Sequence, residues 1–194
     1  MKTIEIELYK FTELSENAKN KAIEKEKENM EIFLDFFSDD CREQISENGF
    51  KGNIKLKYSL SYSQGDGLSF SCDYFDNLKE LFIEILGTEK QKTIDTILNN
   101  ISFKCDGNNW RYCYASKNDI NLELDNYCYV KSSTNIDNLI SKVESKLKDL
   151  YIDLCNQLEK QGHDDIEYQY SDEYITETLT ENDYYFTIDG LIYY

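Results

Sequence analysis

One apolar stripe, between residues 136 and 158, constrains the fold of this chain more than any other feature. Leucine, isoleucine, valine and tyrosine recur along it at intervals of three and four residues, which is the repeat of one helix face. The stripe predicts a long helix near residues 135–161 that ends at Gly162. Because one sustained stripe can cover the face of a sheet, we expect strands elsewhere in the chain to supply that sheet.

Runs of alternating apolar and polar residues predict these strands. Two of them flank the glycine loop, defined as Gln64-Gly65-Asp66-Gly67, and predict a β-hairpin whose residues 60 and 62 share a buried face with residues 68 and 70. The predicted strands are residues 3–11, 54–62, 68–74, 101–105, 110–115 and 121–131.

Shorter helices are predicted between the strands. Ser15 is suited to cap the first of them, and Gly87 to end a later one. The remaining apolar sets at helical spacing lie at residues 30–45, 76–86 and 89–99. Helices and strands in this order indicate an α+β fold, with one mainly antiparallel sheet and helices packed on it, in a single domain of residues 1–194.

The chain ends in an acidic element, residues 161–194, for which we predict a short helix followed by a hairpin. Ser171 or Asp172 is suited to cap the helix, and Asp189-Gly190 to form the turn between two short strands. This element contains nine acidic residues and neither lysine nor arginine.

The charge of the whole chain restricts its partners. With 38 acidic and 21 basic residues, the net charge is −17. Such a protein is repelled by nucleic acids and by anionic membranes, so we expect it to bind neither directly. A basic protein surface is the partner that this charge favours, because opposite potentials steer association.

The acidic element supplies the candidate binding residues. Carboxylates suit lysine and arginine side chains of a partner, and tyrosines serve as anchors that lose little conformational entropy. A solvated surface without function is the alternative interpretation of any acidic run. The predicted contacts are Asp164, Asp165, Glu167, Tyr168, Tyr170, Asp172, Glu173, Tyr174, Glu177, Glu181, Asp183 and Tyr184.

The glycine loop is a second candidate. A phosphate-binding loop normally leads into a helix and a calcium loop needs more carboxylates, whereas this loop leads into a predicted strand. We therefore interpret it as a hairpin turn whose Gln64 and Asp66 are candidate contacts for a partner.

Cysteine and histidine give weaker indications. The six cysteines are expected to be reduced and mostly buried, and none forms a Cys-x-x-Cys pair. Cys105, Cys113 and Cys128 would converge only if their strands paired, so neither a zinc site nor any other cofactor is predicted. The one histidine, His163, follows the predicted helix end in an exposed loop, which argues against a Cys–His catalytic pair.

Three stretches resemble a widespread, mostly uncharacterised group of small phage and prophage proteins. These stretches are "LYKFTELSENAKNKAIE" at residues 8–24, "YSQGDGLSFS" at 62–71 and "YQYSDEYITETLTENDYYFTIDGLIYY" at 168–194. The resemblance implies an accessory protein of a phage or mobile element, and it implies no catalytic residues. Some proteins of this group carry an antitoxin-like label.

Charge and resemblance together favour a non-enzymatic inhibitor of a host defence complex, similar to anti-CRISPR proteins and DNA mimics. It would act in the bacterial cytoplasm, since residues 1–5 do not begin a signal peptide and no apolar run could span a membrane. One alternative is an antitoxin-like or structural protein that sequesters a phage-encoded partner. Another is a small hydrolase, which would need acidic residues or Cys113 gathered in a pocket with Trp110.

Overall fold

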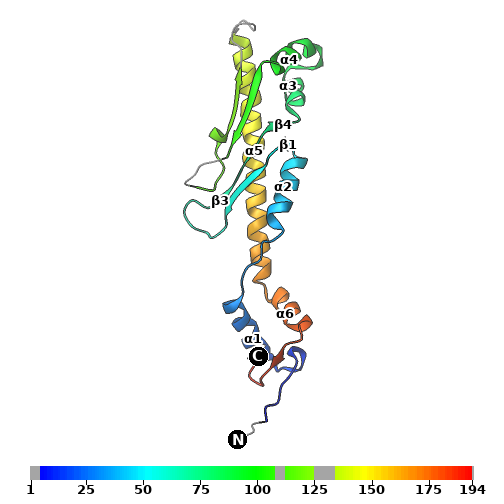
Figure 1. Cartoon of the computed structure of the whole chain (residues 1–194), viewed down its shortest axis with the longest axis vertical. Helices are drawn as coiled ribbons and strands as arrows, with labels where there is room; N and C mark the ends of the chain where they lie inside the picture. Colours follow the sequence, from blue (N-terminus) through cyan, green and yellow to red (C-terminus); the bar gives the residue numbers. More distant parts are fainter. Residues whose placement is uncertain (1–4, 108–111, 125–133, 194) are drawn as a thin grey trace. The chain divides into compact units, whose positions relative to one another are not determined.

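The computed structural model describes residues 5–107, 112–124 and 134–193, and it contains helices and antiparallel strands throughout (Figure 1). The predicted α+β class is confirmed. The chain divides into two compact units, called unit 1 (Met1–Phe33 with His163–Tyr194) and unit 2 (Leu34–Gly162).

Unit 2 contains a four-stranded antiparallel sheet. Phe70 of its second strand lies opposite Leu56 of the first, and Cys72 lies opposite Cys105 of the third. The glycine loop joins the first two strands, as predicted. In spatial order the strands are β2 (Lys55–Ser59), β3 (Gly67–Cys72), β5 (Ile101–Asp106) and β6 (Ile120–Leu124).

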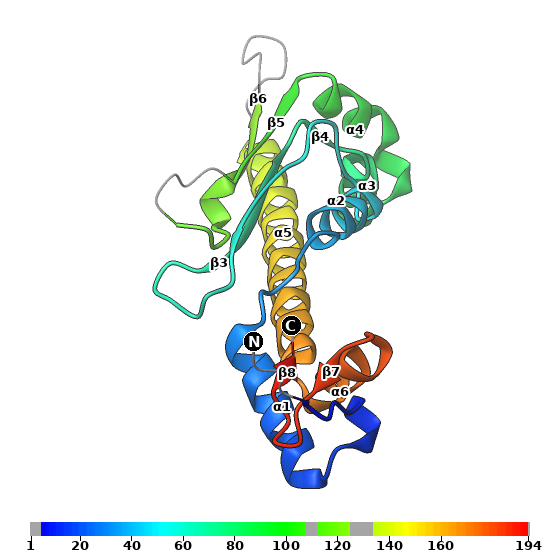
Figure 2. The ribbon, with the colours of Figure 1, turned by 60° about the horizontal axis from the view of Figure 1, so that its bottom comes forward.

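The long helix α5 (Thr134–Gln169) lies along this sheet, as Figures 1 and 2 show. Its apolar stripe packs against the sheet. Val143, Leu147 and Tyr151 are fully buried, and the Tyr151 ring lies 4.8 Å from that of Phe70. The predicted long helix is therefore confirmed. Its stripe forms one core cluster with the apolar face of the sheet.

Unit 2 also contains three shorter α-helices, a small ladder and the 3₁₀ turns η2 (Thr88–Lys90) and η3 (Lys117–Asp119). Phe37 and Cys41 in the first helix, and Phe82 in the second, are buried in the same core as the α5 stripe. The helices are α2 (Phe37–Glu47), α3 (Leu78–Leu86) and α4 (Gln91–Leu98), and the ladder pairs β1 (Phe50–Lys51) with β4 (Tyr74–Phe75).

Unit 1 has its own apolar core, formed by residues from the two ends of the chain (Figure 2). Phe11 packs against Phe186 with ring centroids 5.8 Å apart, and both side chains are buried. The elements are η1 (Phe11–Glu13), α1 (Glu16–Asn29), α6 (Asp172–Glu181), β7 (Tyr185–Phe186) and β8 (Ile192–Tyr193).

Two predicted caps begin the helices of unit 1. The Ser15 side chain accepts a hydrogen bond from the Ala18 N–H at the start of α1, and the Ser171 side chain accepts one from the Tyr174 N–H at the start of α6. Both serines thus satisfy backbone donors that the first helical turn leaves without partners.

The small residues of α1 allow the β7–β8 turn to lie directly on the helix. Gly190 has φ 84°, and a Cβ on it would overlap the carbonyl oxygen of Ala18. Ala18 and Ala22 are buried beneath this hairpin. Glycine is needed here both for the left-handed backbone and for the close approach.

The predicted strand at residues 3–11 was wrong for the described residues 5–11. Residues 5–8 have no regular structure, and only Tyr9 forms an isolated bridge, to Phe186. Phe11 already begins the 3₁₀ turn of η1. The strand that faces this segment, β7, is only two residues long, so it cannot form a longer ladder with residues 5–11.

The predicted helix end at Gly162 was also wrong, because α5 continues to Gln169. A Cβ on Gly162 would lie 2.5 Å from Leu60 Cδ1 and 2.8 Å from Phe37 Cζ. This glycine therefore permits close side-chain packing against a continuous helix, and it does not act as a C-terminal stop.

Other strand predictions need smaller corrections. The first hairpin strand ends at Ser59, and Tyr62 is exposed instead of sharing a buried face. In the predicted strand 110–115, residues 112–115 are not a strand and the rest lies outside the described residues. β6 covers the start of the predicted strand 121–131, and residues 125–131 also lie outside the description. Two small ladders accompany the four-stranded sheet.

Candidate functional site

The predicted contacts of the acidic element all lie in unit 1, on three consecutive segments. They occupy the last turns of α5 and the turn after it, the helix α6 and the chain just after α6. All of these side chains are exposed except that of Tyr174, which is half-buried. The structure therefore brings the predicted contacts together on one unit and leaves most of them accessible.

Lysines from the N-terminal segment compensate part of this acidic charge. Lys27 of α1 forms an ion pair with Asp172, and Lys10 Nζ lies 3.1 Å from Asp183 Oδ1. The same Lys10 ammonium lies 3.8 Å from the centre of the Tyr185 ring. Sequence reasoning missed these lysines because it treated residues 161–194 as a separate element.

The surface of α6 carries an acidic stripe, defined as Glu173, Glu177 and Glu181. These residues follow each other at intervals of four, so their side chains project from one helix face about 6 Å apart along the axis. All three are exposed, and none forms an ion pair with a described residue. Like charges at this spacing repel, and Glu181 also lies in the last helical turn, where the helix dipole disfavours a negative charge.

Tyr174 belongs to α6, and the other tyrosines among the predicted contacts, Tyr168, Tyr170 and Tyr184, precede or follow this helix in the chain. Tyr168 and Tyr174 meet edge to face with ring centroids 5.4 Å apart, and Tyr168 remains 52% exposed. Tyr170 and Tyr184 are also exposed. Rings that are already held by a neighbour bury apolar area on binding at little further entropic cost.

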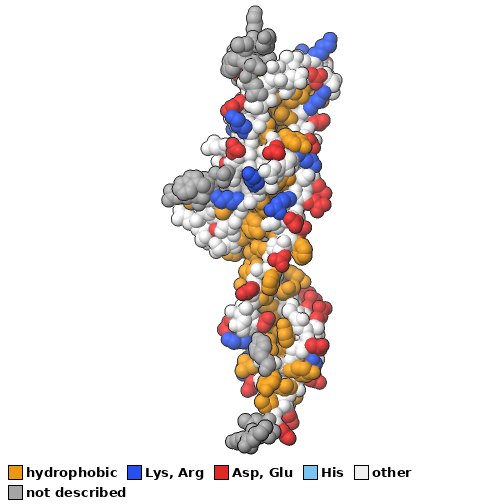
Figure 3. Space-filling view, viewed as in Figure 1, with side chains coloured by type: hydrophobic (Ala, Val, Ile, Leu, Met, Phe, Trp, Pro, Cys, Tyr) orange, Lys and Arg blue, Asp and Glu red, His pale blue; other side chains and the backbone are white. Residues whose placement is uncertain are grey.

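Unit 1 is more acidic than unit 2. Its residues include 17 acids and 6 lysines, a net charge of −11, whereas the longer unit 2 carries the remaining −6. On the face shown in Figure 3, red acidic side chains gather beside α6 with few lysines among them. A basic surface is therefore the complement of unit 1.

His163 lies inside α5 and is half-buried, so the prediction of an exposed loop histidine was wrong. Among the described cysteines, Cys41, Cys72, Cys105 and Cys155 are buried thiols. Burial raises the pKa of the Cys155 thiol, which keeps it protonated and a poor nucleophile.

The residues considered for zinc or hydrolysis do not form a described site. Within the described ranges, no group of three or more histidine, cysteine or acidic residues is placed to hold a metal ion. Cys113 is half-buried, and its N–H donates to the Gly65 carbonyl at 2.9 Å. Cys128 and Trp110 lie outside the described residues.

The glycine loop is organised around the carboxylate of Asp66. Ser59 Oγ donates to it at 2.6 Å, and Ser63 donates from both its backbone N–H and its hydroxyl, at 2.7 and 3.0 Å. Ser61 Oγ donates at 3.0 Å. These hydrogen bonds hold the pKa of Asp66 well below its ordinary value, since they favour the charged form.

The Asp66 carboxylate is thus engaged by hydrogen bonds within the loop, whereas the Gln64 side chain is exposed. Tyr62 has φ 58°, a left-handed conformation that is rare for a residue with a side chain, and is 69% exposed. A Cβ on Gly65 would lie 2.5 Å from Tyr112 Cδ1, so this glycine permits contact with the neighbouring ring. The loop is therefore an ordered hairpin end.

Replacing Asp66 with asparagine should loosen this loop without unfolding unit 2. The charged acceptor that binds the three serines is lost, so amide exchange at Ser63 should become several-fold faster. In the native protein the same loosening is expected at low pH. Because the pKa of Asp66 is lower in the folded than in the unfolded chain, its contribution to stability is complete above the unfolded pKa and is lost as pH falls from there through the folded pKa. Hydrogen exchange followed by NMR measures both effects; equal rates in D66N and the native chain would contradict this role.

Comparison of the sequence with models of known protein families, with curated proteins and with solved structures finds no match. None of the helices within the described residues combines the length and the apolar composition that crossing a bilayer requires.

Proposed function

We propose that the chain is a non-enzymatic inhibitor that binds a basic protein surface through unit 1. The acidic stripe is the observation that carries this proposal, because its three exposed glutamates have no described cationic partner. Tyr168, Tyr170 and Tyr184, which flank α6 in the chain, are exposed and supply apolar contact area. The stripe and these tyrosines would form the centre of the contact.

The proposed target is a nucleic-acid-handling complex of a bacterial defence system, for example a CRISPR effector. Such proteins bind phosphates with rows of lysine and arginine, and these rows attract any line of anionic groups. Carboxylates at intervals of about 6 Å along α6 offer such a line on a rigid helix. The resemblance to phage proteins agrees with a target in a bacterial host.

Neutralising the acidic stripe tests the proposal. The variant E173Q/E177Q/E181Q should bind a basic effector about 3- to 140-fold more weakly, because each of the three exposed ion pairs contributes roughly 0.2–1 kcal/mol. Its folding stability should stay equal or rise slightly, since two repulsive pairs at i,i+4 are removed. Displacement of a labelled DNA duplex from a purified CRISPR effector, over a range of salt concentrations, measures the binding.

A matched variant shows whether binding depends on the position of the removed charges or only on the total charge of the protein. E43Q/E47Q/E80Q removes three exposed charges from unit 2, so the net charge changes equally. We expect this variant to displace the duplex as the native chain does. Equal weakening by both variants would reduce the proposal to non-specific attraction, and no displacement by the native chain from any effector in a panel would refute it.

A further inference from the structure

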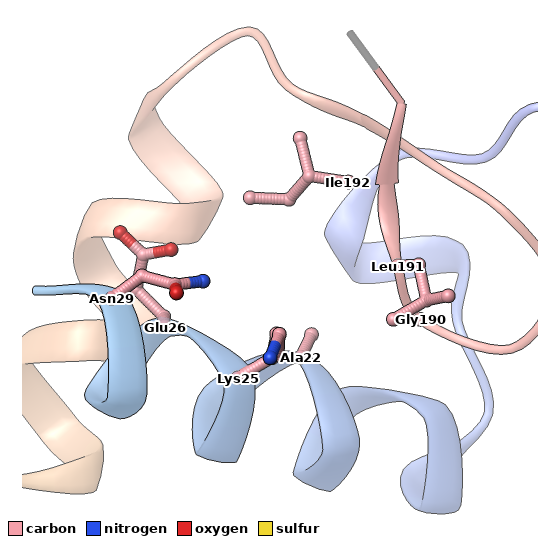
Figure 4. A pocket seen from close by; sticks show the side chains of 7 residues that line it. All are labelled: Ala22, Lys25, Glu26, Asn29, Gly190, Leu191 and Ile192. Carbon is pink, nitrogen blue, oxygen red and sulfur yellow. The ribbon is translucent and has the colours of Figure 1, made fainter.

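A pocket in unit 1 lies between α1 and the end of the β7–β8 hairpin (Figure 4). Its volume is about 240 Å³, which is smaller than the usual 300–1,000 Å³ of a pocket for a drug-sized ligand. One side chain of a partner is a better match for this size. The lining residues are Ala22, Lys25, Glu26, Asn29, Gly190, Leu191 and Ile192.

The pocket combines an apolar part with a carboxylate. Ala22 is buried, and Leu191 and Ile192 add apolar surface from the hairpin (Figure 4). Glu26 is half-buried and forms no ion pair with a described residue, although Lys25 beside it is held 2.8 Å from Glu28. A lysine or arginine side chain matches this combination, because its stem is apolar and its end is cationic.

β8 also presents backbone groups along the side of the hairpin away from β7. Phe186 of β7 exchanges hydrogen bonds with Tyr9 at 2.8 and 2.9 Å, so its own N–H and C=O point away from β8. Ile192 lies directly opposite Phe186. When the N–H and C=O of one residue of such an antiparallel pair point away from the partner strand, those of the opposite residue also point away. The N–H and C=O of Ile192 therefore point away from β7, and no described strand pairs with this edge.

Large apolar side chains are exposed around this edge. Ile188 is 69% exposed, Leu191 51% and Tyr193 49%. Three such side chains within six residues, on a unit with net charge −11, indicate a surface that a partner covers.

We propose that an extended segment of a basic protein partner lies along the edge of β8 and inserts a lysine or arginine side chain into the pocket beside Glu26. The proposal rests on the proposed function and adds a second contact to the acidic stripe. A second copy of this chain is a poor occupant, because two units of net charge −11 repel. The segment would pair its backbone with Ile192 and cover Leu191 and Tyr193.

An NMR titration of the full-length, ¹⁵N-labelled protein tests this site with a defined probe, the peptide acetyl-Val-Lys-Val-Lys-Val-amide. We expect saturable shifts in the amide signals of Ala22, Gly190, Leu191 and Ile192. E26Q should weaken binding at these signals about fivefold or more, since a charge-assisted hydrogen bond is lost. The matched control is E24Q, because Glu24 is an exposed residue of the same helix that does not line the pocket. E24Q should leave peptide binding unchanged.

Two N-methylated peptides test the backbone contact. One carries N-methyl groups on its valines and the other on its lysines, so each loses one of the two alternating sets of N–H donors. Strand addition predicts that only one of them loses binding. Equal effects of E26Q and E24Q, equal binding of both methylated peptides, or the absence of shifts at Gly190–Ile192 would each overturn the proposal.

The same spectra separate the two proposals. Shifts at Glu173, Glu177 and Glu181 report binding of the basic peptide to the acidic stripe, whereas shifts at Gly190, Leu191 and Ile192 report the pocket. If the pocket signals fail while the stripe signals respond, the strand-addition proposal is wrong and the proposed function stands. If E173Q/E177Q/E181Q displaces duplex DNA normally while the pocket binds the peptide, the role of the stripe is wrong instead.

Discussion

Replacing Gly190 with alanine is expected to abolish the packed structure of unit 1. The added methyl group would overlap the Ala18 carbonyl oxygen in the backbone of α1, and φ of 84° is unfavourable for alanine. Left-handed strain costs about 1–3 kcal/mol and steric overlap with an immobile backbone adds to it, so the total should be about 3 kcal/mol or more. Loss of dispersed amide signals from α1, α6 and the hairpin measures this.

Gly87→Ala is the matched control. Gly87 has a nearly identical φ of 85°, but a Cβ there would meet only the Glu89 carboxylate, 2.6 Å away, and that exposed side chain can move. Unit 2 should therefore lose about 1–2 kcal/mol and stay folded. If Gly190→Ala unfolds both units in one transition, the chain is the single cooperative domain that the sequence predicts. A fully folded unit 1 in this variant would contradict the described packing.

Replacing Tyr151 with alanine should give the largest loss of stability in unit 2. The Tyr151 ring is fully buried against Phe50 and Phe70, and removing a buried aromatic ring costs about 3–5 kcal/mol. Its hydroxyl donates to the Phe70 carbonyl at 3.0 Å and accepts from the Phe70 N–H at 3.3 Å. Denaturant unfolding of unit 2, followed by far-UV circular dichroism, measures the loss.

Tyr151→Phe separates the two contributions, because it keeps the ring and removes the hydroxyl. The single proton of this hydroxyl is shared between the Phe70 carbonyl at 3.0 Å and the Asp119 carboxylate at 3.3 Å, so both acceptors lose a hydrogen-bond partner, which should cost roughly 1–3 kcal/mol. Burial already raises the pKa of Asp119, so the loss of Tyr151 as a donor should raise that pKa further. Equal stabilities of the phenylalanine variant and the native chain would show that the hydroxyl network contributes nothing.

The sequence predicted those elements that a local pattern determines. The stripe between residues 136 and 158 predicted α5, and Ser15 and Ser171 predicted the starts of α1 and α6. Matched alternation on both sides of the glycine loop predicted the β2–β3 hairpin. In each case a residue's own neighbours in the chain carry enough information.

Predictions failed where distant residues decide the structure. Gly162 was read as a helix end because glycine usually is one, but Phe37 and Leu60 occupy the space that a side chain would need. The alternation at residues 3–11 predicted a strand, but among the described residues the segment forms a single bridge, between Tyr9 and Phe186. Neither contact can be read from local spacing.

The sequence predicted the negative charge of the candidate site but not which of its carboxylates form ion pairs. Composition alone indicated an exposed acidic element, and its carboxylates are exposed. The ion pairs of Lys10 and Lys27 with Asp183 and Asp172 join residues that are about 150 positions apart or more, so the sequence did not single out the acidic stripe. The pocket between α1 and the β7–β8 hairpin was missed entirely, since no local pattern brings Ala22 and Glu26 together with residues 190–192.

The discontinuous composition of unit 1 has a consequence during synthesis of the chain. Residues 34–162 emerge from the ribosome as one continuous stretch and can fold at once, whereas residues 5–33 must wait for residues 163–193. At about 5–20 residues per second, synthesis from Phe33 to Phe186 takes roughly 8–31 s, during which Phe11 and Leu14 lack one or more of their C-terminal core partners. The N-terminal segment is therefore exposed to chaperones and proteases on the ribosome, and its lysines and glutamates help to keep it soluble until Phe186 arrives.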